Sequence, residues 1–455
     1  MKAPFRAAIF GVLGCVCLMS CMNNQTRTKY DYKEGEPNYS SYSKDRVMRI
    51  GAWVAPPPGN WNGKGNADFI NQERYDEIAE SGINVIYSLY ENNNRVAAKA
   101  CAQYAAAAGI KYLARDGQVS VDPIKMELEP GEMHEATKSY DGEEGLGGWL
   151  IQDEPGLGEF EKLGNLHAYF KNEYPGKEFY VNLFPTYANI SQLGTSSYKQ
   201  YIDKYIEIVK PPYVSYDHYS MLVDGYGNYK MSEDVLWNLE IVASRCKEAG
   251  IPMYTFIQAM SYDGQTRVPN EKEIRHQVMT QLAYGSRSIQ YFCYWTPLEF
   301  TQGSPAMMTV DGKKTDIYDH VKKINGELLN LDEAYLDFSW VETLAIKGSE
   351  ERNVVKQFNM LELSPESIES ISSINATQNT LVGHFEDKTG RDAFLVMNFS
   401  DPATNAEKDK VSLDLFGATS ALVYHGVNKE VVELNDGMLE LELEAGDGGF
   451  IIPFK

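Results

Sequence analysis

Eight short apolar segments recur between residues 49 and 295, and the stretches between them have the spacing of amphipathic helices. The segments are 49–55, 84–91, 111–116, 147–155, 178–185, 212–219, 252–260 and 288–295. Helices are expected over 69–83, 93–110, 159–174 and 271–287, and several helices end at a glycine, such as Gly82, Gly109 or Gly250. Parallel strands need a crossover connection, and eight strand–helix units can close into a ring. The repeat therefore predicts an α/β fold, a (β/α)8 TIM barrel over residues 48–336. A doubly wound open sheet is the alternative, but no GxGxxG follows the first strand.

The pattern changes after about residue 336. Short segments such as "TLVGHFED", "DAFLVMNFS" and "SALVYHG" alternate apolar and polar residues, and turn signals separate them. No long helical pattern interrupts them. Residues 337–455 are therefore predicted to form a small antiparallel β-sandwich with a structural role. A chain of 455 residues has room for one large and one small domain.

The N-terminus reads "MKAPFRAAIFGVLGCVCLMSC", with two cationic residues before an apolar run that is short for a membrane span. This pattern is typical of an export signal over residues 1–21. The ending "LMSC" resembles the lipobox of bacterial lipoproteins, which implies lipidation of Cys21 and anchoring to a membrane. The outer membrane is expected, on its periplasmic face or at the cell surface. An ordinary signal peptide is the alternative. Residues 22–47 are mostly polar and lack periodicity, so a flexible tether is expected there.

Composition argues against several classes of ligand. The formal charge is −22, whereas nucleic-acid binding needs a basic face. Outside the presumed signal, Cys101, Cys246 and Cys293 lie far apart and show no CxxC spacing, so neither a disulfide framework nor a zinc site is expected. The histidines lack ligand spacing and no GxSxG is present. We therefore expect no metal, no cofactor and no nucleic-acid partner.

The active site of a (β/α)8 barrel lies at the carboxyl ends of its strands. Polar and aromatic residues occupy these positions: Trp53, Glu91, Asp116, Asp153, Glu154, Asn182, Asp217, His218, Tyr219, Gln258 and Trp295. Neighbouring carboxylates raise one another's pKa, which suits a general acid, and two carboxyl groups across a bond can hydrolyse a glycoside. Amides, imidazole and aromatic rings suit the hydroxyls and C–H faces of sugars. The set predicts a carbohydrate site.

The fourth segment ends in "WLIQDEP", which resembles the "NEP" ending in the large clan of (β/α)8 glycoside hydrolases, where the glutamate is the acid/base. The matching residue is Glu154. Residues 307–328, "MMTVDGKKTDIYDHVKKINGEL", resemble the segment after the eighth strand in β-galactosidase-like members, as does the small β domain. This resemblance covers most of residues 48–455 and implies hydrolysis of a poly- or oligosaccharide. The sequence departs from the clan at Asp153, where asparagine is usual, and at Gln258, where the clan places its nucleophile.

Three interpretations follow from these departures. In the first, another strand supplies the second catalytic carboxylate: Asp217 is favoured, and Glu91 and Asp116 are the other candidates. Alternatively, Asp153 and Glu154 act like the Asp–Glu pair of hexosaminidases, in which the aspartate orients the acetamido group of the substrate. In the third, the chain is a carbohydrate-binding lipoprotein without catalysis.

The same residues also have structural alternatives. The acidic pair could cap the following helix, Asp217 could bond His218, and Trp295 could pack in the core. The remaining candidates are expected to bind substrate: Trp53, Glu91, Asp116, Asn182, His218, Tyr219, Gln258 and Trp295. The oligomeric state stays open.

Overall fold

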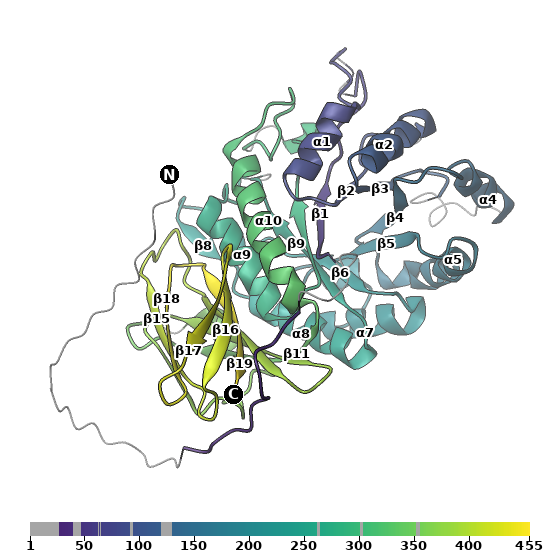
Figure 1. The fold of residues 1–455 in the computed structure, drawn as a ribbon. Coiled ribbons are helices and arrows are strands. Elements are labelled where there is room, and N and C mark those ends of the chain that lie inside the picture. Colours follow the sequence, from purple (N-terminus) through teal and green to yellow (C-terminus); the bar gives the residue numbers. More distant parts are fainter. Residues whose placement is uncertain are drawn as a thin grey trace.

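A computed structural model describes residues 27–39, 47–61, 63, 65–91, 94–119, 130–261, 264–300, 304–351 and 355–455. Across these ranges the chain forms a closed barrel of parallel strands followed by an antiparallel β domain (Figure 1). The expected signal segment and Cys21 lie outside the described residues. None of the helices in the described ranges combines the length and apolar character needed to cross a membrane.

Each predicted barrel segment contains or overlaps one strand of the closed sheet. In chain order the strands are β1 Arg49–Trp53, β2 Val85–Tyr87, β3 Lys111–Ala114, β4 Leu146–Asp153, β5 Glu178–Leu183, β6 Val214–Asp217, β9 Met253–Gln258 and β10 Ser288–Phe292. Their order around the barrel is β1-β10-β9-β6-β5-β4-β3-β2, and all neighbours are parallel. A hairpin of β7 Met221–Val223 and β8 Tyr229–Met231, which the sequence pattern did not predict, follows β6.

Helices surround the barrel (Figure 1). They are α1 Gln72–Glu80, α2 Arg95–Ala107, α4 Pro130–Lys138, α5 Phe160–Glu173, α6 Ile190–Leu193, α7 Tyr198–Val209, α8 Val235–Ala249, α9 Glu271–Ala283 and α10 Asp316–Tyr335, with 3-10 turns η1 Leu157–Glu159 and η2 Leu298–Phe300. Helix α7 buries Tyr198, Tyr201, Tyr205 and Val209, spaced three or four residues apart, as an amphipathic helix should. The apolar stripe fixes which side of each helix faces the strands.

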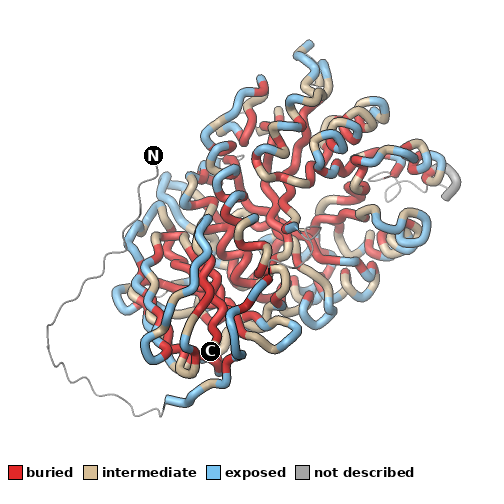
Figure 2. Tube along the Cα trace, viewed as in Figure 1, coloured by how far each residue is buried: buried red, intermediate tan, exposed pale blue. Residues whose placement is uncertain are grey.

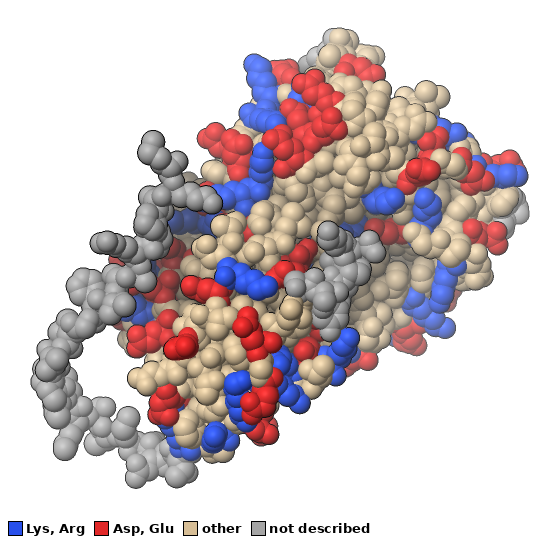
Figure 3. Space-filling model, viewed as in Figure 1, with Lys and Arg blue, Asp and Glu red and all other residues tan. Residues whose placement is uncertain are grey.

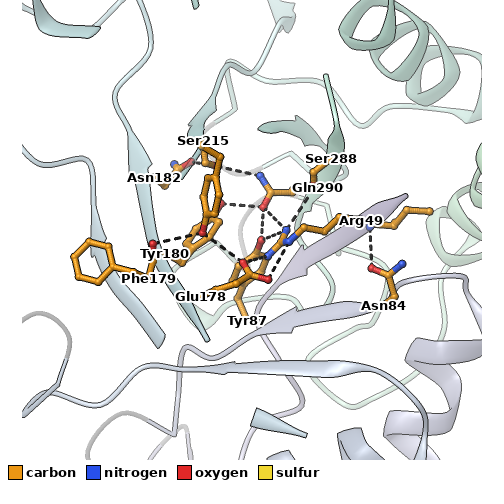
Figure 4. A network of polar contacts seen from close by, with 12 residues as sticks. Arg49, Asn84, Tyr87, Glu178, Phe179, Tyr180, Asn182, Ser215, Ser288 and Gln290 are labelled. Carbon is orange, nitrogen blue, oxygen red and sulfur yellow. Dashed lines mark hydrogen bonds and ion pairs between the residues drawn. The ribbon is translucent and has the colours of Figure 1, made fainter. Parts of the chain in front are cut away.

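Polar side chains fill the amino-terminal half of the barrel interior (Figure 4). The guanidinium of Arg49 forms an ion pair of 2.8 Å with Glu178 and donates to Gln290 at 3.0 Å. The hydroxyl of Tyr87 also donates to Gln290. A Cβ atom at Gly51 would lie 3.0 Å from the Tyr87 ring, so glycine makes room for that ring. The interior is therefore packed rather than hollow, as in other barrels of this size.

The C-terminal domain contains two antiparallel sheets. The larger has the order β11-β13-β14-β19-β16-β17 and the smaller β12-β15-β18. Their bounds are β11 Phe338–Ile346, β12 Ser373–Ala376, β13 Thr380–Asp387, β14 Asp392–Asn398, β15 Asp409–Asp414, β16 Ser420–His425, β17 Asn428–Glu433, β18 Met438–Leu443 and β19 Gly448–Phe454, with a short helix α11 Lys356–Asn359 after β11. The predicted β-sandwich is confirmed. The sequence pattern missed β11, β12 and β17, and the edge strand β17 is almost wholly exposed and polar.

The central strands of the larger sheet, β13, β14, β16 and β19, are buried on both faces, so the two domains share a core (Figure 2). On one face Val382 and Val396 pack toward the smaller sheet. On the other face Leu381 and Leu395 belong to the same apolar cluster as the barrel. A Cβ atom at Gly383 would lie 2.3 Å from a backbone oxygen near the end of α9, so a glycine is required for this close approach. The β domain is packed firmly against the barrel.

Surface charges on the face seen in Figure 3 are interspersed rather than gathered by sign. Glu80, for example, lies 3.4 Å from the ammonium of Lys314 and 2.5 Å from that of Lys322. Part of the large negative charge is therefore balanced locally on the helices around the barrel.

Residues 27–39, which the sequence pattern assigns to a flexible tether, pack along the β domain (Figure 1). Arg27 forms ion pairs of 2.6 Å with Asp414 and with Asp436. Tyr32 is 3% exposed and donates to the backbone of the segment before β12, and Tyr39 is buried against Phe338. The expectation of a tether is wrong for this segment, because a few side chains bind partners almost 400 residues away in the chain.

Replacing Tyr32 by Ala should lower the free energy of unfolding by about 3 kcal/mol, because a buried aromatic ring is removed from the sandwich core. Urea denaturation of a chain beginning at residue 22 measures this loss. Tyr226→Ala is the matched control, since that ring is 94% exposed. Equal midpoints for Tyr32→Ala and the control would contradict the packed position of the segment.

Candidate active site

The adjacent carboxylates at the end of β4 are positioned by an irregular strand. Pairing with β5 shifts register between Leu150 and Gln152, so one extra residue forms a bulge. Glu154 then takes a left-handed backbone conformation with φ 51°, and its N–H donates to the backbone oxygen of Asn182 at 2.8 Å. Neighbours on a regular strand face opposite sides, and a left-handed glutamate is uncommon. The bulge and this conformation together let both Asp153 and Glu154 act on one site, a use of bulges that is frequent beside active sites.

Asn182 on β5 connects two of the acidic residues. Its Nδ2 donates to Asp217 at 2.7 Å and lies 3.4 Å from Asp153, so these carboxylate oxygens are within about 6 Å of each other. The hydroxyl of Ser215 donates to the Asn182 carbonyl at 3.2 Å, which fixes the orientation of the amide. Asp217 is 6% exposed, whereas Asp153 and Glu154 are partly exposed. The three carboxyl groups thus form one cluster at the barrel mouth.

The cluster holds protons that isolated carboxylates would release. Burial raises the pKa of Asp153 to about 6, although the charge of Arg115 and the hydrogen bond from Asn182 oppose the shift. Burial and the charge of Asp153 raise the pKa of Glu154 to about 7. Burial, followed by the charges of Glu154 and Asp153, raises the pKa of Asp217 well above its usual range. Near neutral pH the cluster therefore retains a protonated carboxyl group, which general acid catalysis requires.

His218 is fixed beside the cluster by a bond to Asp234, not to Asp217. Its Nε2 lies 3.1 Å from the Asp234 carboxylate, which also accepts from Ser232 at 2.5 Å and from Thr186 at 2.6 Å. Burial would raise the pKa of Asp234, but the hydrogen bonds and charge of these partners hold it below its usual range. The structural alternative, a bond between Asp217 and His218, is not found, because His218 bonds Asp234. Asp217 therefore remains part of the acidic cluster.

The aromatic candidates occupy three different environments. Trp53 is 6% exposed and lies over the interior, with its ring centroid 5.7 Å from that of Phe256. Tyr219 is partly exposed beside Phe292. Trp295 is 0% exposed and packs against Phe69 at 4.6 Å. Trp295 is therefore a core residue, whereas Trp53 and Tyr219 lie near the mouth.

Two of the predicted acidic residues are engaged elsewhere. Glu91 is fully buried, and its carboxylate accepts from the hydroxyl of Ser88 at 2.7 Å. Asp116 forms an ion pair of 2.6 Å with Arg95 and accepts from Tyr140 at 3.0 Å. These contacts hold both carboxylates away from the cluster, and neither is brought to Asp217.

Gln258 on β9 is likewise committed within the protein. Its Nε2 donates to the backbone oxygen of Met221 at 3.2 Å and to that of Arg267. Its backbone N–H donates to Gln277 at 2.9 Å, and the residue is 0% exposed. The amide fastens two loops, so the structure gives this position a packing role.

Three residues near the site were not among those predicted. Arg115 directly follows β3, Asp234 precedes α8, and Tyr187 lies after β5 with its ring 5.2 Å from that of His218. Strand alternation could have indicated Arg115, because it stands one residue before the predicted Asp116. No sequence pattern connects Asp234 with His218, which lies 16 residues earlier.

Two surface cavities lie apart from this site. One, of about 330 Å³, is lined by Met253, Gly285 and Trp340 near the amino end of β9. The other, of about 480 Å³, lies between α5 and α7 beside His167. Neither is lined by a residue of the acidic cluster. In the described ranges no three His, Cys, Asp or Glu side chains are grouped as metal ligands.

Comparison with known proteins supports the architecture. No protein-family model and no curated protein sequence matches the chain. A solved α-amylase from Anoxybacillus matches with a TM-score of 0.50 at 10% identity, covering 92% of this chain and 99% of that chain. An α-amylase from Geobacillus thermoleovorans has a TM-score of 0.49 at 11% identity, covering 90% of this chain and 98% of that one. A GH30 endoxylanase from Clostridium papyrosolvens C71 has a TM-score of 0.42 at 9% identity, with 94% and 98% covered.

These structural neighbours are glycoside hydrolases. At identities near 10% the likeness shows the fold alone. The protein thus has the (β/α)8 barrel and β-sandwich expected from its sequence, with an acidic cluster at the carboxyl ends of the strands.

Asp217→Asn should stabilise the protein, and the gain should grow from pH 4 to pH 8. The folded-state pKa of Asp217 is raised, so the folded protein binds a proton that the unfolded chain releases, and stability falls as pH rises toward the folded value. The neutral amide avoids this penalty and should add about 1–2 kcal/mol at pH 8. Chemical denaturation at several pH values measures it, with the exposed Asp141→Asn as control. A less stable Asn variant at pH 8 would contradict the assignment.

Proposed function

We propose that the protein is a glycoside hydrolase acting on a poly- or oligosaccharide, with Glu154 as the general acid/base. The observation that carries this proposal is the cluster of Asp153, Glu154 and Asp217 at the barrel mouth, where burial raises the pKa of all three carboxyl groups and neighbouring carboxylates raise those of Glu154 and Asp217 further. Gathering three carboxyl groups costs stability, and folds retain such costs chiefly where chemistry needs a protonated acid beside a second carboxylate.

Each carboxyl group has a role that its surroundings support. Glu154, with a pKa of about 7, protonates the leaving glycosidic oxygen. Asp217, oriented by the amide of Asn182, activates water or attacks the anomeric carbon in its ionised form, which the hydrogen bond from Asn182 favours. Burial and the charge of Asp153 together raise the pKa of Glu154 and keep it protonated. Trp53, Tyr219 and His218 lie near the mouth and are proposed to contact sugar, whereas Glu91, Asp116, Gln258 and Trp295 are proposed to support the fold.

We also propose that the chain is exported and anchored to a bacterial membrane through lipidated Cys21. The sequence "LMSC" supports this. Arg27 lies six residues after Cys21, a distance along the chain of at most about 20 Å. Such an anchor would hold the β domain close to the membrane surface rather than on a long tether.

Glu154→Gln should lower turnover of natural glycans by about 10²- to 10⁴-fold, because the amide keeps the shape but has no transferable proton. Substrates with very good leaving groups need little protonation and should lose less. The wild-type rate should fall as pH rises through about 7, where Glu154 loses its proton. Steady-state rates on a panel of glycans and aryl glycosides measure these effects.

The exposed Glu161→Gln on α5 is the matched control and should retain full activity. Near-normal rates for a folded Glu154→Gln protein would remove Glu154 as the acid.

The same panel of substrates distinguishes the three possible mechanisms. Cleavage restricted to 2-acetamido sugars, with inhibition by a thiazoline, would assign Asp153 the substrate-orienting role, and turnover of other sugars would assign the second carboxylate to Asp217. A glycan that binds and survives long incubation would favour the non-catalytic alternative.

Cys21→Ala should move the protein from the membrane fraction to the soluble fraction, because the proposed lipid anchor is attached to this residue. Fractionation followed by immunoblotting measures the change, and Cys17→Ala is the control. Unchanged membrane association of Cys21→Ala would show that another segment holds the protein there.

A further inference from the structure

Arg115 lies at the barrel mouth next to the acidic cluster. It directly follows β3, the neighbour of β4, whose last residue is Asp153. Two residues earlier, Leu113 pairs with Tyr87, a residue whose side chain lies inside the barrel. Because side chains two apart on a strand share a face, Arg115 points toward the barrel axis. The guanidinium is close enough for its charge to act on Asp153.

Within the described part of the chain, Arg115 differs from Arg49 and Arg95 because no acceptor is found for its side chain. Its Nε is buried without a hydrogen-bond partner, and no hydrogen bond or ion pair to its side chain is found among the described residues. By contrast, Arg49 binds Glu178 and Arg95 binds Asp116, each at 2.8 Å or less. The side chain of Arg115 is only partly buried, so its remaining donors can meet a bound molecule.

Covering this guanidinium with a neutral sugar would be costly. A charge removed from water needs a compensating charge and hydrogen bonds, and hydroxyl groups supply only the latter. The charge of Arg115 acts on Asp153, but no hydrogen bond or ion pair joins the two side chains, and Asp153 lies 3.4 Å from the amide of Asn182. A planar carboxylate or a sulfate matches the fork of a guanidinium, accepting two parallel hydrogen bonds.

We propose that Arg115 is a specificity-determining residue that binds an acidic group, the carboxylate of a uronic acid or a sulfate ester, on the sugar held at the barrel mouth. This inference rests on the proposed glycoside hydrolase function and names its substrate class. The preferred substrate is an acidic glycan, and Arg115 contacts its charged substituent while Glu154 and Asp217 face the glycosidic bond.

The test is calorimetric binding in a Glu154→Gln background, which separates binding from hydrolysis. The probes are an oligogalacturonate, a sulfated oligogalactoside and the neutral oligogalactoside of equal length. At least one acidic probe should bind at least about 10-fold more tightly than the neutral one, in keeping with a charge-assisted pair. Arg115→Gln should remove most of this difference in affinity and change the affinity for the neutral probe less than about 2-fold. Higher salt should weaken the binding of the acidic probes only. Arg115→Lys should be intermediate, and Arg245→Gln on α8 is the control.

The two acidic probes distinguish a uronate from a sulfate as the recognised group. Equal affinity for all three probes, binding of neither acidic probe, or an equal loss on all three probes in Arg115→Gln would overturn the proposal. Unfolding midpoints of the variants exclude a general loss of structure. If an acidic glycan binds through Arg115 but the wild-type protein does not cleave it, the hydrolase proposal fails while this inference stands.

Discussion

The part-buried ion pair between Arg49 and Glu178 is the contact on which the rest of the barrel depends. Two charges inside a barrel must be paired and fully hydrogen-bonded, and removing one partner leaves the other uncompensated. Gln290 accepts from Arg49 at 3.0 Å and donates to Ser215 at 3.1 Å (Figure 4). Ser215 donates to Asn182 at 3.2 Å, and Asn182 donates to Asp217. A continuous chain of hydrogen bonds thus runs from the ion pair to the acidic cluster, so the packing of the interior also sets the position of Asp217.

The acidic pair at the end of β4 is positioned by an irregularity of that strand rather than by the packed interior. The bulge in β4 and the left-handed conformation of Glu154 turn two adjacent carboxyl groups toward one site. A left-handed glutamate costs of order 1 kcal/mol or more, and the clustered charges add to that cost. The surrounding sheet must therefore be stable enough to impose the conformation. The sequence "QDEP" records this arrangement as two acids before a proline, where a regular strand would place only one of them at the mouth.

Much of the fold could be predicted from the sequence, because apolar segments and helical spacing repeat eight times and mark the ends of the barrel strands. Glu154 and Asp217 followed from those ends. The sequence did not indicate Arg115, because a shift of one residue along a strand exchanges its inner and outer faces. The neighbouring residue Asp116 was predicted at the mouth instead. The interior network was also missed, since Arg49 and Glu178 look like exposed strand-end residues until the barrel closes around them. The packing of residues 27–39 depends on contacts with the far end of the chain, for which polar sequence gives no periodic signal.

The contacts of Gln258 explain why the seventh barrel strand, β9, carries an amide and not a glutamate at its end. The Gln258 amide donates to the backbone oxygens of Met221 and Arg267. Arg267 is itself buried between Glu273 and Asp401, each at 2.5 Å, which ties the loop after β9 to the β domain. A glutamate at position 258 would present acceptors to two carbonyl oxygens, and its ionised form would be strongly disfavoured there. Glutamine supplies the two donors that these carbonyl oxygens need, so the contacts that hold the two domains together favour an amide over a carboxylate at this position. In the proposed mechanism the second carboxylate therefore comes from another strand, and Asp217, whose pKa is raised by burial and by the charge of Glu154, is the candidate.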